Sequence, residues 1–512
     1  MSAGPLPEAV AVHRHPSQRN ELVDHLKTPN RWLILATMTG ALSMVMIDQT
    51  VVSVALPTMQ HDLGLSATGV QWVVNAYLLV LAVLVAFGGR IADLFGAELT
   101  FRAGASLFVL ASALCGLAQN ELMIIASRGL QGVGAAMMTP STGAVIVNTF
   151  DIRERGKAMG IYTGISMVFL ALGPLVGGVL TQSVSWRAVF YVNLPIGAAI
   201  VTAAHFTLPR RPRPRIARGA IDWTGIPLLV GGLGTLVLAL MQGQTWGWGS
   251  PAVLALLAVA ALLIPVFLWW EGRAPAPLVT LKLFREQNFG ADSAVLAGVQ
   301  FALVGASVFG SVWSQQVLGF SAIHAGEAML PLTVPLLFVA PLGGRIYDRL
   351  GPRPLLVTGA LLIGAGLAWL GWHLHLREYW WLAPGYVAMG AGIGLTISPG
   401  TTDALGAAVP QRRSQASGIV QTVRQVGGVI GIAVLGAIVA NVSVVAPGAG
   451  PAAHLTAATN GLAAAYLTGA AMMVVMAIVA MMFVRRRALE GLSAVPTAPQ
   501  LSAAAPRALA GR

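Results

Sequence analysis

Long apolar runs separated by short polar links are the feature that most constrains what this chain can fold into. We predict fourteen apolar segments, each long enough to form a helix of about 20 residues that crosses a lipid bilayer. Only 10% of the 512 residues are charged, whereas soluble domains have about 25%, so an ordinary soluble fold is excluded. The approximate segments are 32–57, 70–89, 100–118, 122–148, 157–182, 187–208, 220–242, 251–270, 290–316, 327–345, 354–372, 380–408, 415–440 and 463–484.

The basic residues orient these segments. With a cytoplasmic N-terminus, 27 of the 31 Lys and Arg residues fall in cytoplasmic links and tails, as the positive-inside rule requires. Arg187 and Arg377 fall outside, and Arg128 and Arg424 fall within helices. The net charge of +12 therefore reflects topology, and we expect no nucleic-acid partner. We predict an all-α multi-pass protein of the plasma (inner) membrane with both termini cytoplasmic.

An internal repeat divides the chain. The loops at 89–96 ("GRIADLFG") and 344–351 ("GRIYDRLG") share the pattern G-R-I-x-D-x-x-G, and both follow an even-numbered segment. Duplicated halves are typical of secondary transporters, whose substrates bind between the halves. We predict two six-helix halves and an inserted helix pair, with an N-terminal tail at 1–31, halves at 32–208 and 290–484, the inserted pair and its loops at 209–289, and a C-terminal tail at 485–512.

Motifs of other function classes are missing from the sequence. Cys115 is the single cysteine, which excludes a disulfide framework and a Cys-rich metal site. We find no phosphate-binding loop, zinc-ligand spacing or catalytic triad. We therefore expect no cofactor, no metal and no enzymatic activity.

Several motifs make the chain similar to one transporter family. The sequences at 46–57 ("MIDQTVVSVALP"), 128–136 ("RGLQGVGAA"), 172–178 ("LGPLVGG") and 423–431 ("VRQVGGVIG") resemble those of the fourteen-helix drug:proton antiporters of the major facilitator superfamily. Further matches lie at 186–197, 221–229 and 314–326, and the resemblance runs from about residue 32 to residue 484. It implies export of amphipathic drugs or antibiotics in exchange for protons by alternating access. In one departure, Ala97, Glu98 and Leu99 stand where family members have basic residues.

Two pairs of opposite charge lie within predicted helices, where an ionisable residue is costly and therefore a functional candidate. Asp48 and Arg128 lie about 13 Å and 10 Å from the predicted outer boundary, at 1.5 Å per residue, so they could face each other. A permanent bridge between helices is one interpretation. A proton switch is the other, and the resemblance favours it, because it implicates the acid of the first helix in coupling.

Asp403 and Arg424 are the second pair. Both lie in the cytoplasmic half of their helices and could form a bridge that holds one conformation. A second proton or cation site at Asp403, or a side chain extended toward the membrane interface, are the alternatives. Asp292 and Asp222 each open a helix, and we interpret both as N-terminal caps.

The repeated loops and the glycines of the fifth helix are predicted to control conformation. Asp93 and Asp348 lie at helix ends, where they could accept hydrogen bonds from neighbouring helix N-termini or from Arg. The alternative is a solvated turn. The proposed cytoplasmic gate comprises Gly89, Arg90, Asp93, Gly96, Gly344, Arg345, Asp348, Arg349 and Gly351. The resemblance implies that Gly164, Gly173, Pro174, Gly177 and Gly178 form a hinge and a leak-tight seam, beyond the tight packing that small residues provide.

Polar side chains within the helices are candidates for the substrate cavity, although each alone is more often an interhelical hydrogen-bond partner. The candidates are Gln49, Asn75, Tyr77, Gln131, Gln300 and Gln315. The expected partners are protons, a small amphipathic substrate and membrane lipid, and we expect a monomer. Two other functions stay open, which are proton-coupled export of a metabolite, siderophore or amino acid, and a non-transporting membrane receptor or scaffold.

Overall fold

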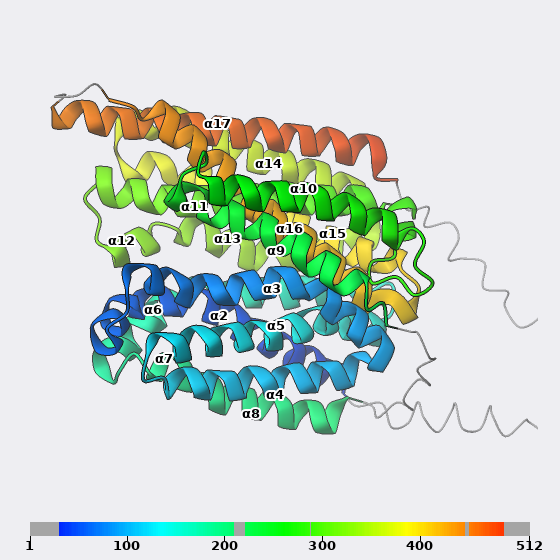
Figure 1. Ribbon diagram of the computed structural model, residues 1–512. Helices are drawn as coiled ribbons and strands as arrows, with labels where there is room; N and C mark the ends of the chain where they lie inside the picture. Colours follow the sequence, from blue (N-terminus) through cyan, green and yellow to red (C-terminus); the bar gives the residue numbers. More distant parts are fainter. Residues whose placement is uncertain (1–29, 209–220, 287, 446–449, 486–512) are drawn as a thin grey trace, which may run out of the picture.

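The computed structural model describes residues 30–208, 221–286, 288–445 and 450–485, and every regular element in them is a helix. Residues 1–29 and 486–512, which make up most of the predicted tails, and residues 209–220 lie outside the described residues. The long helices run side by side in one bundle (Figure 1). In chain order the helices are α2 (Arg31–Leu63), α3 (Ala67–Phe95), α4 (Ala97–Gly116), α5 (Glu121–Thr149), α6 (Arg155–Ser183), α7 (Ala188–Tyr191), α8 (Asn193–Thr207), α9 (Gly225–Trp246), α10 (Pro251–Glu271), η1 (Leu281–Arg285), α11 (Phe289–Val317), α12 (Ala322–Glu327), α13 (Leu330–Leu350), α14 (Pro352–His373), η2 (Leu374–Leu376), α15 (Tyr379–Ala407), η3 (Pro410–Arg412), α16 (Arg413–Val442) and α17 (Pro451–Phe483).

Local sequence explains where several helices begin. The side chains of Asn30, Ser66, Asn120 and Ser250 each accept a hydrogen bond from a backbone N–H in the first turn of the helix that follows. Such caps satisfy donors that have no partner within the helix. At the other end of α2, Gly64 adopts a φ of 62°, which an L side chain rarely does. The polar links between the apolar runs therefore set where these helices begin and end.

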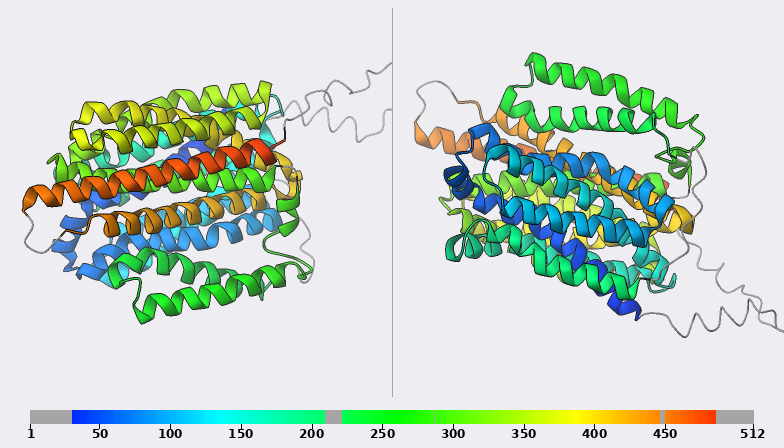
Figure 2. Two further views of the ribbon diagram at one scale, coloured as in Figure 1. Left: turned by 90° about the horizontal axis from the view of Figure 1, so that it is seen from above. Right: turned by 60° about the horizontal axis from the view of Figure 1, so that its bottom comes forward.

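The bundle consists of two halves and a separate pair. The N-terminal half comprises α2–α8, and the C-terminal half comprises α11–α17 (Figure 1). Helices α9 and α10 pack on each other at the edge of the bundle, where α9 contacts α3 and α16 (Figure 2). The inserted pair thus lies beside a seam between the halves and leaves the central interface to the other helices.

Twelve described helices are long and apolar enough to cross a membrane, and the bent helix α6 makes a thirteenth. α15 coincides with the predicted segment 380–408 and packs among α11, α13 and α14. Some predicted boundaries were wrong. α2 continues past Pro57 to Leu63, and α17 starts at Pro451, well before the predicted residue 463. The predicted segment 187–208 agrees with one span at Ala188–Thr207, which comprises α7 and α8.

The two halves meet where α6 packs on α13 and where α3 packs on α16. Small residues permit this approach, because a Cβ atom at Gly160 would lie 2.6 Å from the Ala340 carbonyl oxygen, and one at Gly418 would lie 2.7 Å from that of Val85. We call the end of the bundle at which the two repeated loops lie the motif end. Every hydrogen bond described between the halves lies there.

Candidate functional site: a buried charge network and a central cavity

The structure brings Asp48 of α2 and Arg128 of α5 into direct contact. The Arg128 Nη1 atom lies 2.7 Å from the Asp48 Oδ2 atom, and neither side chain is more than 1% exposed. The Arg128 Nε atom donates to the Val73 carbonyl oxygen at 3.0 Å, and its guanidinium lies 4.4 Å from the centre of the Tyr77 ring. The pair is therefore enclosed between α2, α3 and α5.

Neutral amides complete the network around Asp48. Gln131 Nε2 donates to Asp48 Oδ1 at 2.8 Å, and Asn193 Nδ2 of α8 donates to the same oxygen at 3.2 Å. Gln131 also accepts from Arg128 at 2.6 Å and donates to Ser112 of α4 at 2.8 Å. Two predicted cavity residues, Tyr77 and Gln131, thus belong to this network. Sequence reasoning missed Asn193 and Ser112, because nothing in a single sequence places α4 and α8 against α2.

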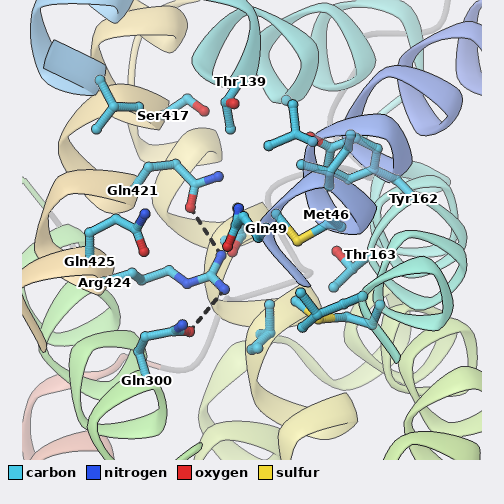
Figure 3. A pocket seen from close by; sticks show the side chains of 18 of the residues that line it. Met46, Gln49, Thr139, Tyr162, Thr163, Gln300, Ser417, Gln421, Arg424 and Gln425 are labelled. Carbon is cyan, nitrogen blue, oxygen red and sulfur yellow. Dashed lines mark hydrogen bonds between the residues drawn. The ribbon is translucent and has the colours of Figure 1, made fainter. Parts of the chain in front are cut away.

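A cavity lies between the halves, with linings from both (Figure 3). Its volume is about 90 Å³, so it is narrow in this state. The predicted residues Gln49 and Gln300 line it, whereas Asn75 does not. Gln315 is exposed, donates to Ser311 of its own helix and is not among the residues that line this cavity. Other lining residues include Met46, Thr139, Tyr162, Thr163, Met167, Gln421, Arg424 and Gln425.

The predicted bridge between Asp403 and Arg424 is not formed, and this part of the prediction needs correction. Arg424 points into the cavity, where its guanidinium donates to Gln421 at 3.0 Å and to Gln300 at 3.3 Å (Figure 3). Asp403 lies at the motif end, where it accepts hydrogen bonds from Tyr347 and Asn288, both at 2.9 Å. The sequence placed both residues at a similar depth in the membrane, which suggested a contact. In the structure, however, the two side chains point to different neighbours.

Asp292 does not cap its helix, contrary to the prediction. It is fully buried in the first turn of α11, and no hydrogen-bond donor among the described residues reaches its carboxylate oxygens. Its carboxyl group faces that of Asp403 instead. Asp222 does act as predicted, because its Oδ1 atom accepts from the backbone N–H groups of Thr224 and Gly225 where α9 begins.

The repeated loops make matching contacts across the two halves. The Asp93 carboxylate accepts from the backbone N–H groups of Ser414 and Gln415, at 3.1 Å and 3.0 Å, at the start of α16. The Asp348 carboxylate accepts from those of Gly156 and Lys157, at 3.0 Å and 3.1 Å, at the start of α6. Asp93 lies in the last turn of α3 and Asp348 in the last turn of α13, so each repeat places an anion at the positive N-terminal end of a helix of the other half.

The other residues of the loops explain this geometry. Gly96 and Gly351 have φ values of 98° and 76°, which favour glycine. Gly89 and Gly344 lie against backbone of the opposite half, where a Cβ atom would not fit. Arg345 and Arg349 are exposed. At the positions where the resemblance implies basic residues, Ala97 starts α4 and Glu98 lies in its first turn, a favourable place for a carboxylate.

The glycines of α6 divide into two groups. Gly164 faces Leu337 of α13 and therefore lies on the seam between the halves, whereas Gly173 and Gly177 pack against Thr50 and Val51 of α2 in their own half. Nothing lies within 4 Å of a Cβ atom at Gly178. Of the predicted seam glycines, Gly164 therefore lies between the halves, whereas Gly173 and Gly177 lie within the N-terminal half.

Pro174 accompanies a bend in α6. The helix bends by 40° between Leu170 and Leu172. Proline removes the N–H that would bond the Leu170 carbonyl oxygen four residues earlier. The Thr50 hydroxyl donates to that oxygen at 2.8 Å. A side chain of α2 thus satisfies the acceptor that the bend leaves free.

A family model described as Major Facilitator Superfamily matches residues 38–432. The chain belongs to the Major Facilitator Superfamily. It is 35% identical to the tetracenomycin C resistance and export protein of Streptomyces glaucescens, over 80% of this chain and 76% of that protein. It is 32% identical to the methylenomycin A resistance protein of Bacillus subtilis, over 84% of this chain and 92% of that protein. The protein is thus a multi-pass membrane transporter of this superfamily and not an enzyme.

The fold agrees with this assignment. The structure of the proton:xylose symporter XylE superposes with a TM-score of 0.64 at 16% identity, over 89% of this chain and 96% of that one. The curated relatives named above are resistance and export proteins for antibiotics.

Proposed function

We propose that this transporter exports amphipathic drugs or antibiotics in exchange for protons, as a monomer in the plasma membrane. The observation that carries the proposal is a cavity lined by both halves beside a buried Asp–Arg pair. The names of the relatives support an antibiotic as the substrate. A proton that crosses a potential of about 150 mV releases about 3.4 kcal/mol, which sustains roughly a 300-fold substrate gradient.

The contacts between the halves support alternating access. They hold the motif end closed through Asp93, Asp348 and the α6–α13 and α3–α16 seams. The placement of basic residues supports a cytoplasmic position for this end. In our proposal the structure is therefore an outward-facing state, α15 is the fourteenth span, and the loop contacts break when the cytoplasmic side opens.

Asp48 is the residue that we propose to carry the proton. Its carboxylate is held by Arg128, Gln131 and Asn193, while the neighbouring residue Gln49 lines the cavity. Protonation would neutralise the carboxylate and weaken these contacts, so that α2 and Gln49 shift and the cavity holds substrate less tightly. Proton and substrate would then compete, as exchange requires. A permanent structural bridge is the competing interpretation.

The test is proton release from inverted membrane vesicles that hold an acid-inside gradient, with antibiotics and lipophilic compounds added in turn. We expect some compounds to dissipate the gradient, and we expect Asp48→Asn vesicles with equal amounts of inserted protein not to respond. Asp151→Asn, in an exposed loop, is the matched control. Wild-type proton release by Asp48→Asn would refute the coupling role. Responses only to cell metabolites, siderophores or amino acids would favour the alternative substrate class.

A further inference from the structure

The charge of the cavity is the starting point. Arg424 is the single charged side chain among the described residues that line it, and none of the lining residues is acidic. Around Arg424 the lining offers four glutamine amides, from Gln49 of α2, Gln300 of α11, and Gln421 and Gln425 of α16 (Figure 3). The remaining wall is largely apolar. The cavity thus carries a net positive charge with amide groups and apolar surface around it.

The guanidinium of Arg424 has no counter-charge in the described part of the chain. Its partners, Gln421 and Gln300, are neutral, no carboxylate lies within ion-pair distance, and its buried Nε atom has no hydrogen-bond partner. Arginine stays protonated in proteins and presents five N–H donors. A charged side chain at this depth in a membrane protein is costly unless it is paired or faces water.

Nearby acidic groups cannot supply that counter-charge in this state. The carboxylate of Asp48 already accepts from Arg128, Gln131 and Asn193. Asp403 accepts from Tyr347 and Asn288 at the motif end. The Tyr162 hydroxyl is hydrogen-bonded to that of Thr142 at 2.5 Å. The position opposite Arg424 is therefore open to an anion that comes from outside the chain.

We propose that the substrates of this exporter are organic anions, and that Arg424 binds their carboxylate or acidic phenol group. This inference rests on the export function proposed above and assigns its substrate class. Arginine suits the role because its planar fork binds carboxylates through two parallel hydrogen bonds. The glutamines would hydrogen-bond carbonyl and hydroxyl groups, and Met46, Met167 and the apolar wall would accommodate a ring system of variable shape.

The experiment compares two dyes of one skeleton in inverted vesicles. Fluorescein methyl ester and rhodamine 123 share a xanthene ring and a methyl benzoate group, but at mildly alkaline pH the first is an anion and the second a cation. We expect the wild type to take up the anion in preference. Arg424→Gln should raise the KM for the anion about 10-fold or more, because a charged contact is lost, and leave the KM for the cation unchanged. Arg424→Lys should keep part of the anion affinity.

Two arms keep the result interpretable. Arg273→Gln, which removes an exposed arginine at the end of α10, is the matched control and should transport both dyes like the wild type. Competition in the wild type needs no variant, and here 2-naphthoate should inhibit dye uptake while the neutral 2-naphthamide should not. Binding of the dyes to purified protein that elutes as a single folded species gives the same comparison without transport.

The outcomes separate the two proposals. Three results would overturn the assignment to anions while export itself stands. They are an equal loss of uptake of both dyes in Arg424→Gln, a preference of the wild type for the cation, and equal inhibition by naphthoate and naphthamide. Uptake of both dyes that ignores the proton gradient would instead overturn proton-coupled export. In that case, tighter binding of the anion than the cation to the purified protein, lost in Arg424→Gln, still supports the anion site.

Discussion

At the scale of single residues, the buried charged side chains of the two halves differ in their hydrogen-bond and ion-pair partners. Asp48 receives an arginine and two amides, so its negative charge is balanced and its oxygens are satisfied. Asp292 receives no donor, and its neighbour is another carboxyl group. Arg424 receives two neutral amides and no carboxylate. These three environments lead to distinct expectations for substitution.

Breaking the Asp48–Arg128 pair from one side should destabilise the protein. Asp48→Asn leaves the guanidinium of Arg128 buried without a counter-charge, and we expect a loss of about 3–5 kcal/mol in the free energy of unfolding. The double variant Asp48→Asn with Arg128→Gln removes both charges and should recover much of that loss. Unfolding by denaturant in detergent measures the difference. A double variant no more stable than Asp48→Asn would show that the charges themselves are not what matters.

The Asp292–Asp403 contact should respond in the opposite direction. Two carboxyl groups in one buried site repel when both are ionised. Asp292→Asn removes one charge and supplies an amide that can donate to Asp403, so we expect an equal or higher melting temperature at neutral pH. Tyr347→Phe removes a hydrogen bond to the Asp403 carboxylate and should cost about 1.5–3 kcal/mol. A marked loss of stability in Asp292→Asn would contradict this interpretation of the pair.

At the scale of helices, the two halves of α6, before and after its bend, make different contacts. The glycines of its first half, Gly160 and Gly164, face α13 across the seam between the halves, whereas Gly173 and Gly177 of its second half face α2. The bend near Pro174 lies between these two parts. A side chain added at a seam glycine before the bend should therefore disturb the contact between the halves. One added after the bend, at a position with open space around it, should not.

Gly160→Leu tests this division. Its Cβ atom would lie 2.6 Å from the Ala340 carbonyl oxygen, so the seam at the motif end should be forced apart and transport lost. In a Cys115→Ala background, Gln425→Cys in the cavity should then react faster with a thiol reagent added to the cytoplasmic side. Gly178→Leu on the same helix is the control, because nothing lies within 4 Å of its Cβ position. Equal labelling in both variants would argue against a seal at Gly160.

At the scale of the whole molecule, the charge of the substrate decides how transport responds to membrane potential. Exchange of one inward proton for one outward monoanion moves two elementary charges in the favourable direction, each contributing about 2.3 kcal/mol per 100 mV. Exchange for a monocation moves no net charge. The two halves and the cavity between them are the same in both cases, so only the charge bound at Arg424 differs.

A potential that is positive in the lumen of inverted vesicles should therefore accelerate uptake of the anionic dye. A potassium gradient with valinomycin sets this potential, and dye fluorescence reports uptake. Uptake of the cationic dye through a one-to-one exchange should not respond. Equal acceleration of both dyes would contradict the predicted stoichiometry of charge.

The sequence by itself determined the class of fold, because long apolar runs can satisfy their backbone in a membrane only as helices. The repeat around Asp93 and Asp348 also predicted two related halves, and the quoted motifs predicted the family that the comparisons show. Matched depths sufficed to suggest the contact of Asp48 with Arg128. Each of these features depends on spacing along the chain or on local composition.

Only the tertiary structure decided which way each helix turns its side chains. Residues at one depth can point in any direction around the helix axis, so similar depth wrongly suggested a bridge between Asp403 and Arg424. Polarity alone likewise left open whether Gln131 lines the cavity or bonds neighbouring helices, and the structure shows the second. The polar residues Gln421, Arg424 and Gln425, three and four positions apart on α16, were a signal of a cavity-facing stripe. Packing against α11, α3 and α5 turned that stripe inward and left the charge of Arg424 unpaired.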